Sequence, residues 1–327
     1  MKAAIYTTYG SADVLTLEEV KKPSFADGEV LVQIHAASVT AADTMMRRGS
    51  PYLGRLMLGL RRPKQQILGT GFAGVIAAVG ANVSLFKPGD RVFGETVFGF
   101  GTYAEFTVLK EQDLILSMPE NTSFDEAASI CDGPLTDMNF LRNLANIQPG
   151  QRILINGASG SLGTAAVQLA AHFGAHVTGV CSTANMDMVR DLGAHQVIDY
   201  TQVDFTQTGQ RFDIVYDTVG KSSFAQSKRI LTPDGVYLSP VLSCALLFQM
   251  LRTSVFGRKK AKFSATGMLP VADLHKMLVD LRGMLAAGHL ISVVDRRYKL
   301  AQIAEAHRYV DTGHKRGNVV IAPACAA

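Results

Sequence analysis

The sequence predicts an α/β protein in which a parallel, doubly wound sheet is inserted between two parts of a β-rich, barrel-like domain. The first 110 residues consist of short apolar runs separated by Gly, Pro and Asp, as in the turn KPGD at 87–90. From residue 152 onward, apolar strand-like runs alternate with helical segments, which is typical of a doubly wound sheet. We therefore expect the β-rich domain at 1–125 and 269–327, and the doubly wound domain at 126–268.

The individual elements follow from apolar periodicity and from turn residues. In the β-rich part we expect strands at 3–6, 30–39, 72–80 and 102–109, and a helical stretch begins near Asp125. In the doubly wound part we expect strands at 152–156, 176–180, 196–200 and 212–220, with helices at 162–173 and 186–192. A helix at 272–288 and closing strands at 291–298 and 317–323 complete the β-rich domain.

Composition and charge exclude several classes of protein. The 327 residues are 47% hydrophobic and 18% charged, so no long disordered stretch is expected. A net charge of +4 is too small for the clustered basic field of nucleic-acid binding. The start of the chain carries no signal-like apolar run, and the most apolar segment, Val241 to Leu251, is about half of what a bilayer span requires. We expect a soluble, cytoplasmic protein with no nucleic-acid or membrane partner, and Val241 to Leu251 as a helix that closes a cleft or forms a dimer interface.

The most specific motif is a glycine-rich loop between an apolar strand and a helix. It reads NGASGSLG at 156–163 and includes Ser159, Gly160, Ser161, Leu162 and Gly163. Glycines in such a loop allow a tight turn and let the backbone approach a pyrophosphate, while the helix N-terminus presents N–H groups to the phosphates. The spacing GxxGxxG is a variant of the dinucleotide fingerprint. The alternative is a glycine-rich turn with no ligand.

The turn after the next strand bears on the choice of dinucleotide. An NAD site typically places an acidic residue there to bind the ribose 2′-hydroxyl. This chain has CSTAN at 181–185, in which Ser182 and Thr183 can donate hydrogen bonds to a 2′-phosphate. The sequence therefore favours NADPH as the cofactor, although the turn has no Lys or Arg and Asp187 lies nearby. A helix N-cap by Ser182 or Thr183 is the alternative.

Taken together, these segments resemble the zinc-independent medium-chain dehydrogenase/reductase superfamily, in the quinone oxidoreductase (zeta-crystallin-like) group. The resemblance is carried by GASGSLGTAAVQLA, LGAHQVIDY, DIVYDTVG, KPGDRVFG, GTYAEF, LGTGFAGVIAAVG and the tail VVDRRYKLAQIAEAHRYVDTGHKRGNVVI. It implies a GroES-like catalytic domain built from both chain ends, a Rossmann-type domain between them, NADPH bound in the cleft between the domains, and a homodimer.

The resemblance also implies roles for individual residues. Cofactor contacts would come from Gly160, Ser161, Leu162, Ser182, Thr183, Tyr200, Val219 and Asn318, and Thr136 would lie near the nicotinamide. Thr40 and Met45 stand where quinone oxidoreductases commonly have Asn and Tyr, so we expect Thr40 in the catalytic region of a less polar pocket.

Zinc-dependent relatives carry a Cys after the segment that here reads ASV, and a Gly-His-Glu after the following strand. This chain has Thr40-Ala41-Ala42-Asp43 and Gly69-Thr70-Gly71 at those places. The four cysteines are far apart and form no CxxC pair. Because tetrahedral zinc needs three or four Cys, His or carboxylate ligands, we expect no metal site.

Two further side chains are candidates on their position alone. Tyr52 follows a Gly-Ser-Pro turn and could donate a proton or hydrogen bond to a substrate oxygen, or be a half-buried packing residue. Asp43 could orient a substrate, but we favour a turn cap. With no metal and no evident catalytic dyad, the sequence predicts NADPH-dependent hydride transfer to a quinone or another electron-poor carbonyl. An alkenal or enone C=C reductase is the alternative, and a non-catalytic nucleotide- or RNA-binding protein a remote one.

Overall fold

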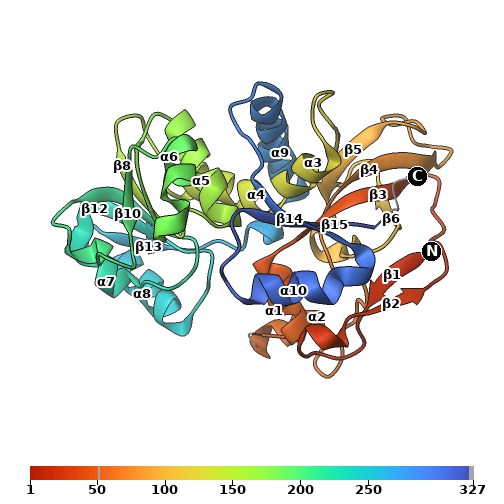
Figure 1. Cartoon of the computed structure of the whole chain (residues 1–327), viewed down its shortest axis with the longest axis horizontal. Helices are drawn as coiled ribbons and strands as arrows, with labels where there is room; N and C mark the ends of the chain where they lie inside the picture. The colour runs from red at the N-terminus through yellow and green to blue at the C-terminus, as the bar shows by residue number, and fades with distance from the viewer. Residues whose placement is uncertain (51, 324–327) are drawn as a thin grey trace. The chain divides into compact units, whose positions relative to one another are not determined.

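The computed structural model describes residues 1–50 and 52–323, and it divides into two compact units (Figure 1). Unit 1 contains Met1–Asp132 and the chain from Pro270 onward, and unit 2 contains Gly133–Leu269. The divisions therefore fall after Asp132 and Leu269, close to the boundaries expected after residues 125 and 268. No helix in the described residues is long and apolar enough to cross a membrane.

The sheet of unit 1 is built from both ends of the chain. Among the described residues it has seven strands, in the order β14-β15-β3-β4-β5-β7 with β6 paired to β3, and β1 and β2 form a separate pair. All of these pairs are antiparallel except β14–β15. The strands are β1 (Lys2–Ile5), β2 (Thr16–Glu19), β3 (Glu29–Val39), β4 (Gly71–Val79), β5 (Arg91–Glu95), β6 (Phe106–Lys110), β7 (Ile115–Ser117), β14 (Val294–Lys299) and β15 (Asn318–Ala322).

The helices of unit 1 begin at side-chain caps that the sequence supplies. Thr40 and Asp43 form a capping box at the start of α1 (Ala41–Arg48), and Ser123 and Glu126 form one at the start of α3 (Phe124–Ile130). Gly49 ends α1 in the left-handed conformation. The other helices are α2 (Arg55–Leu58), α9 (Val271–Ala286) and α10 (Ile303–Asp311).

Unit 2 contains a wholly parallel sheet of six strands within the described residues, in the order β10-β9-β8-β11-β12-β13. Its central strands are almost continuously buried, as strands covered on both faces must be. The order reverses between β8 and β11, which confirms the doubly wound fold expected from the sequence. The strands are β8 (Arg152–Asn156), β9 (His176–Cys181), β10 (Gln196–Asp199), β11 (Phe212–Asp217), β12 (Leu231–Leu238) and β13 (Lys260–Lys262).

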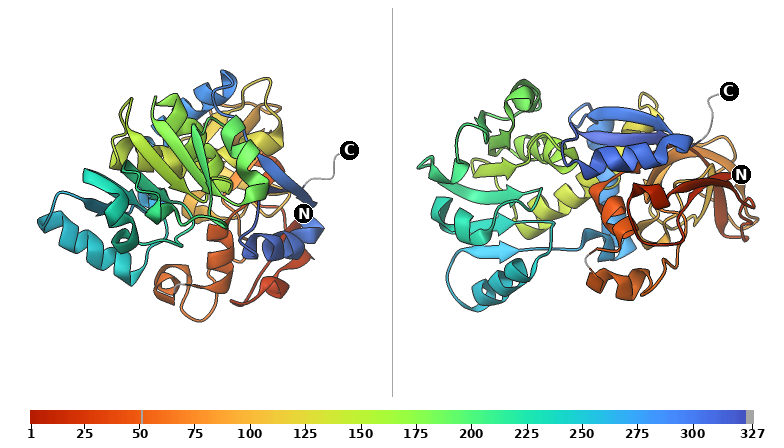
Figure 2. Two further views of the ribbon diagram at one scale, coloured as in Figure 1. Left: turned by 60° about the vertical axis from the view of Figure 1, so that its left-hand side comes forward. Right: turned by 60° about the horizontal axis from the view of Figure 1, so that its bottom comes forward.

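Helices connect these strands and cover the sheet. Because parallel crossovers are right-handed, the reversal of strand order places the helices before and after it on opposite faces (Figures 1 and 2). The helices of unit 2 are α4 (Gly133–Met138), α5 (Ser161–His172), α6 (Met186–Asp191), α7 (Phe224–Ser227) and α8 (Cys244–Val255).

Candidate functional site

The carboxyl ends of four parallel strands of unit 2 meet at one edge of the sheet. The register pairs Asn156 at the end of β8 with Val180 of β9 and with Asp217 of β11, and pairs Cys181 of β9 with Asp199 of β10. The loops that leave these strands therefore lie together, next to the point where the strand order reverses. Ligands of open α/β sheets bind at this point.

The glycine-rich loop fills the first of these connections, and its three glycines have different reasons to be glycine. Gly157 has a φ of +82°, and a Cβ there would lie 2.6 Å from Cγ1 of Val219. A Cβ at Gly163 would lie 2.0 Å from the carbonyl oxygen of Gly157. A Cβ at Gly160, by contrast, would have no atom closer than the carbonyl oxygen of Gly157, at 3.5 Å. The fold therefore requires Gly157 and Gly163, whereas Gly160, at the N-cap of α5, leaves space that the protein does not use.

A buried carboxylate fixes the loop that follows β11. Asp217 is fully buried, and its Oδ1 accepts hydrogen bonds from Nδ2 of Asn156 at 2.9 Å and from the Gly220 amide at 3.0 Å. Its Oδ2 accepts from the amide of Ser222 at 2.8 Å and from the hydroxyl of Tyr237 at 3.1 Å. This network connects β8, β11 and β12. It also holds the loop that contains Val219 at the sheet edge.

The turn after β9 is connected to both neighbouring loops. Nδ2 of Asn185 donates to Oγ of Ser182 at 3.2 Å and to Oγ of Ser159 at 3.3 Å, which links this turn to the glycine loop. The hydroxyl of Thr183 donates to Asp199 at the end of β10. Hydrogen bonds from Thr183 and Thr201 lower the pKa of Asp199, so this exposed carboxylate is ionised near neutral pH. The sequence did not indicate Asp199, because the usual position of a ribose-binding acid is the turn after β9, whereas Asp199 ends β10.

Unit 2 therefore brings together most of the residues expected to bind the cofactor. Tyr200 and Val219 are exposed by 53% and 42%, as side chains that face a ligand would be. Thr136 lies half-buried on α4, and a Cβ at Gly133 on the same helix would lie 3.3 Å from Oγ of Ser161. The expected residues gathered in unit 2 are Thr136, Ser159, Gly160, Ser161, Leu162, Gly163, Ser182, Thr183, Tyr200 and Val219.

In unit 1, Thr40 is a helix cap. Its hydroxyl and its amide both lie 2.8 Å from Oδ2 of Asp43, and it accepts in turn from the amide of Asp43. The preference for Asp43 as a cap is therefore confirmed. Burial raises the pKa of Asp43, and the hydrogen bonds from Thr40 oppose that shift. The buried Tyr103 hydroxyl has its pKa raised by burial and then by the negative charge of Asp43.

The antiparallel register of unit 1 also assembles a charged cluster that the sequence did not reveal. Glu95 pairs with Gly71 across β5 and β4, and a Cβ at Gly71 would lie 3.4 Å from Cβ of Cys131, next to Asp132. Burial and then Asp43 raise the pKa of Asp132 to about 6. Burial lowers the pKa of Lys315 to about 8, against the opposing charge of Asp132. The positive charge of Lys315 lowers the pKa of Asp132 and the negative charge of Asp132 raises that of Lys315, so each charge partly offsets the effect of burial on the other group.

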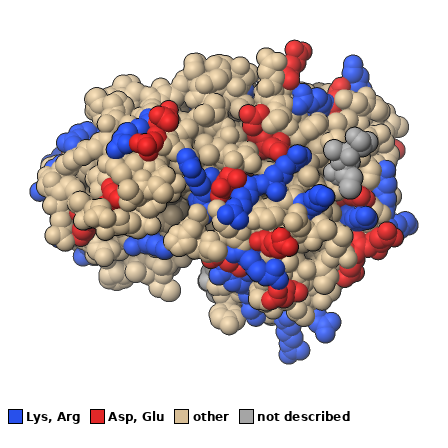
Figure 3. Space-filling view, in the orientation of Figure 1, with Lys and Arg blue, Asp and Glu red and all other residues tan. Residues whose placement is uncertain are grey.

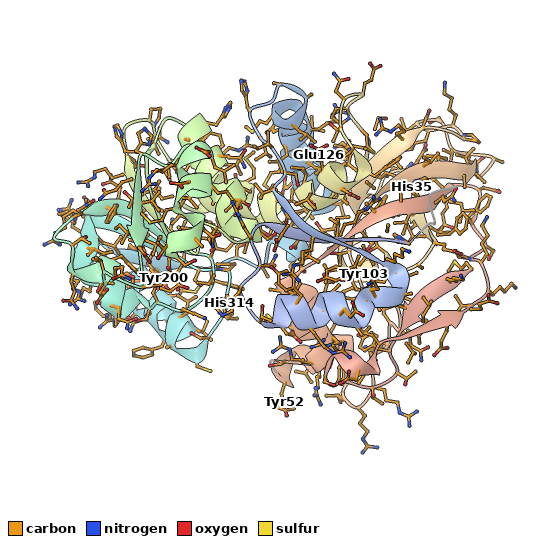
Figure 4. All side chains as sticks on the ribbon, viewed as in Figure 1. His35, Tyr52, Tyr103, Glu126, Tyr200 and His314 are labelled. Atoms are coloured by element: carbon orange, nitrogen blue, oxygen red, sulfur yellow. The ribbon has the colours of Figure 1, made fainter. Side chains whose placement is uncertain are left out.

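Two expected site residues of unit 1 remain, Tyr52 and Asn318. Tyr52 is 78% exposed with the Arg55 guanidinium over its ring, and Figure 4 places it at the lower edge of the unit, away from Tyr103. It is therefore not half-buried. Asn318 is 7% exposed at the start of β15, where its Nδ2 donates to the carbonyl of Val293 at 3.2 Å. The register places Val319, the next residue, opposite Val39 of β3.

Metal binding has a specific requirement for clustered ligands. Within residues 1–50 and 52–323, no group of three or more His, Cys, Asp or Glu side chains is arranged to hold a metal ion. Thr40 and Thr70 occupy the places where the resemblance put zinc ligands in other proteins, and a threonine hydroxyl is a poor zinc ligand.

Sequence comparison gives matches along nearly the whole chain. A family model described as an alcohol dehydrogenase GroES-like domain matches residues 26–120, and one described as a zinc-binding dehydrogenase matches residues 192–321. A 2-methylene-furan-3-one reductase of Solanum lycopersicum is 32% identical, over 99% of this chain and 79% of the relative. A quinone oxidoreductase of Triphysaria versicolor chloroplasts is 30% identical, over 99% of this chain and 98% of the relative.

Comparison with solved structures agrees. The quinone oxidoreductase of Coxiella burnetii superposes with a TM-score of 0.85 at 28% sequence identity. The match covers 98% of this chain and 99% of that protein. Both units therefore have counterparts in one known architecture.

Proposed function

The chain belongs to the medium-chain dehydrogenase/reductase superfamily and is an oxidoreductase with a nicotinamide cofactor; we propose that it uses NADPH to reduce quinones. The observation that carries this proposal is the space at Gly160. It lies at the reversal point of the parallel sheet and at the N-terminus of α5, and nothing in the fold requires a glycine there.

The residues present fit a dinucleotide. The first turn of α5 presents N–H groups that a helix does not use internally, and the missing side chain at Gly160 allows a pyrophosphate to approach them. Ser182 and the exposed Tyr200 flank the place where the adenosine end would lie in a doubly wound domain. Val219, held by the Asp217 network, and Thr136 on α4 would border the nicotinamide end.

The preference for NADPH rests on Ser182 and on the absence of an acid in the turn after β9. Asp199 acts against it, because its ionised carboxylate would repel a 2′-phosphate and accepts the hydroxyl of Thr183. We propose a preference for NADPH that Asp199 keeps moderate.

The chemistry follows from the side chains available. When bound, the nicotinamide supplies a hydride to the acceptor. Among the residues that the structure describes, no zinc ligand set is available to stabilise the alkoxide of a plain ketone or alcohol, and such charge stabilisation is usually the largest catalytic contribution. A quinone delocalises the incoming charge over its own ring. The protein then has to bind, orient and exclude water, which is the task its side chains can perform.

An enone is the second candidate acceptor. The tomato relative is named a reductase of 2-methylene-furan-3-one, in which a C=C bond is conjugated to a carbonyl. An enone spreads the incoming charge into an enolate, so it makes the same modest demand on the protein.

We also propose a homodimer, which the resemblance implies and which the mass of the protein in solution tests.

The test is a panel of acceptors offered with NADPH to the purified chain, followed by loss of the reduced nicotinamide absorbance. The proposal expects turnover of 1,4-benzoquinone or 9,10-phenanthrenequinone, and negligible oxidation of simple alcohols with NADP⁺. Turnover of enals without any quinone would establish the second candidate instead. Faster turnover of ethanol or of an aliphatic ketone than of any quinone or enal would overturn both.

A further inference from the structure

Asn185 connects the two loops of unit 2 that would bind the phosphates of the cofactor. Its Nδ2 donates to Oγ of Ser182 at 3.2 Å, in the turn after β9, and to Oγ of Ser159 at 3.3 Å, in the glycine-rich loop. A side-chain amide has two N–H hydrogens, and these two bonds use both of them. Asn185 is half-buried, and its side chain makes no capping hydrogen bond at the start of α6.

These two bonds determine what the serine hydroxyls can do. A hydroxyl has one hydrogen to donate, and Asn185 occupies only a lone pair of each oxygen. Within the residues that the structure describes, neither Ser182 nor Ser159 donates its hydroxyl hydrogen to a protein acceptor. Ser182 precedes the short 3₁₀ helix Thr183–Asn185, but its side chain makes no capping hydrogen bond. The helix cap that the sequence left open for Ser182 is therefore not formed, and both hydroxyls can donate to a ligand.

Thr183 differs from Ser182 in this respect. Its hydroxyl donates to the ionised carboxylate of Asp199, so its hydrogen is already used. Of the two hydroxyls that the sequence offered for a 2′-phosphate, only that of Ser182 can donate to one without breaking an existing hydrogen bond.

No strong positive charge replaces these donors at the turn. Residues 181–185 contain no Lys or Arg, and Arg190 of α6 is paired with Asp187 at 2.6 Å. Figure 3 shows positive and negative side chains scattered over the displayed face of unit 2, with no large patch of one sign. Recognition of a phosphate in this turn therefore depends on hydrogen bonds, and on the direction in which the hydroxyl hydrogens point.

We propose that Asn185 is a positioning residue for the cofactor phosphates: by donating to both serine oxygens, it leaves the hydrogen of Ser182 for the 2′-phosphate of NADPH and that of Ser159 for the pyrophosphate. One side chain then connects the residue that distinguishes NADPH from NADH to the loop that binds either cofactor. The inference rests on the proposed use of NADPH and is independent of the acceptor that is reduced.

Calorimetric titration of the full chain with NADP⁺ and with NAD⁺, with no acceptor present, tests this inference. Ser182→Ala should lower the affinity for NADP⁺ about tenfold or more, because it removes a hydrogen bond to a charged group, and should leave the affinity for NAD⁺ nearly unchanged. Ser159→Ala should lower both affinities by a similar factor. Asn185→Ala should lower both, and should lower the ratio of the NADP⁺ affinity to the NAD⁺ affinity by about threefold to tenfold, the factor that one hydrogen bond between neutral groups contributes.

A double-mutant cycle separates positioning from a merely structural role. In the Ser182→Ala background, Asn185→Ala should no longer change the ratio of the two affinities, because Asn185 affects that ratio only through Ser182.

Asn185→Asp tests the direction of the hydrogen bonds. It keeps the shape of the side chain, but an ionised carboxylate can only accept, so both hydroxyl hydrogens should turn away from the phosphates. Ala184→Asp, at the exposed neighbouring position, is the matched control, because it adds the same charge without those bonds. Asn185→Asp should lower the affinity for NADP⁺ at least about tenfold more than Ala184→Asp does.

Two results would overturn this inference alone. One is a ratio that Asn185→Ala lowers by the same factor with and without the Ser182 hydroxyl. The other is an Asn185→Asp protein that binds NADP⁺ as well as the Ala184→Asp protein does. A wild-type protein with equal affinities for NADP⁺ and NAD⁺ would instead overturn the proposed preference for NADPH, and this inference with it.

Discussion

Gly160→Val separates the ligand-binding role of the glycine loop from its structural role. Because the nearest atom to a Cβ at Gly160 is 3.5 Å away and its φ is −81°, the fold has room for a Cβ there without backbone strain. The cost to folding is limited to a poorer N-cap, roughly 1 kcal/mol or less. The branched side chain would occupy the space through which a pyrophosphate reaches the N–H groups of α5. Losing two hydrogen bonds to a charged group costs about 3–6 kcal/mol, which is a loss of affinity of at least roughly a hundredfold.

Calorimetric titration of NADPH and thermal unfolding measure the two effects separately. The expected result is a melting temperature within a few degrees of the wild type and an NADPH affinity reduced at least roughly a hundredfold. Gly283→Val, at an exposed position of α9 where a Cβ meets nothing within 4 Å, is the matched control and should keep full affinity. Gly163→Ala is unsuitable because its Cβ would clash with backbone. A folded Gly160→Val protein that binds NADPH as well as the wild type would refute the role of the loop.

Three further predictions concern the cofactor, the core and metals. Asp199→Asn should raise the ratio of kcat/KM for NADPH to kcat/KM for NADH roughly tenfold, because it removes a negative charge near the 2′-phosphate. Ser182→Ala should lower the same ratio. An unchanged ratio in both variants would show that this turn does not recognise the phosphate. Burial, followed by the charge of Arg47, lowers the pKa of His307 to about 3, so the unfolded chain binds its proton first. The free energy of unfolding should therefore fall by about 1.4 kcal/mol per pH unit below about pH 6.5, until the folded pKa is reached. His307→Phe should remove this part of the slope in denaturant titrations, and an unchanged slope would contradict it. Elemental analysis should find no stoichiometric zinc, and activity should survive a strong chelator; one zinc per chain with activity lost on chelation would contradict the ligand argument.

The parallel sheet and its glycine loop could be predicted from the sequence because their signals are local. Strand and helix periods alternate along the chain, and Gly157 and Gly163 lie where backbone contacts leave no room for a side chain. The reversal of strand order also follows from the fold class. Residues of the loop therefore fell at the carboxyl edge of the sheet as expected.

Contacts set by strand register could not be predicted in this way. Asp199 lies on β10, and only its pairing with Cys181 of β9 brings its carboxylate to Thr183. Asp132 and Lys315 are far apart in the sequence, and only the fold brings them close enough for the charge of each to shift the pKa of the other. Tyr52 was a candidate donor to a substrate oxygen because of the turn before it, but a turn does not determine which way the next side chain points.

The central claim is that this chain transfers a hydride from NADPH to a quinone without a metal. It is tested most directly in a single turnover, with zinc-free enzyme saturated by NADPH and mixed with 1,4-benzoquinone, using cofactor that carries either hydrogen or deuterium at the transferred C4 position. We expect the nicotinamide to be oxidised in the enzyme and the deuterated cofactor to react measurably more slowly. No oxidation by the quinone, or a reaction that appears only after zinc is added, would contradict it.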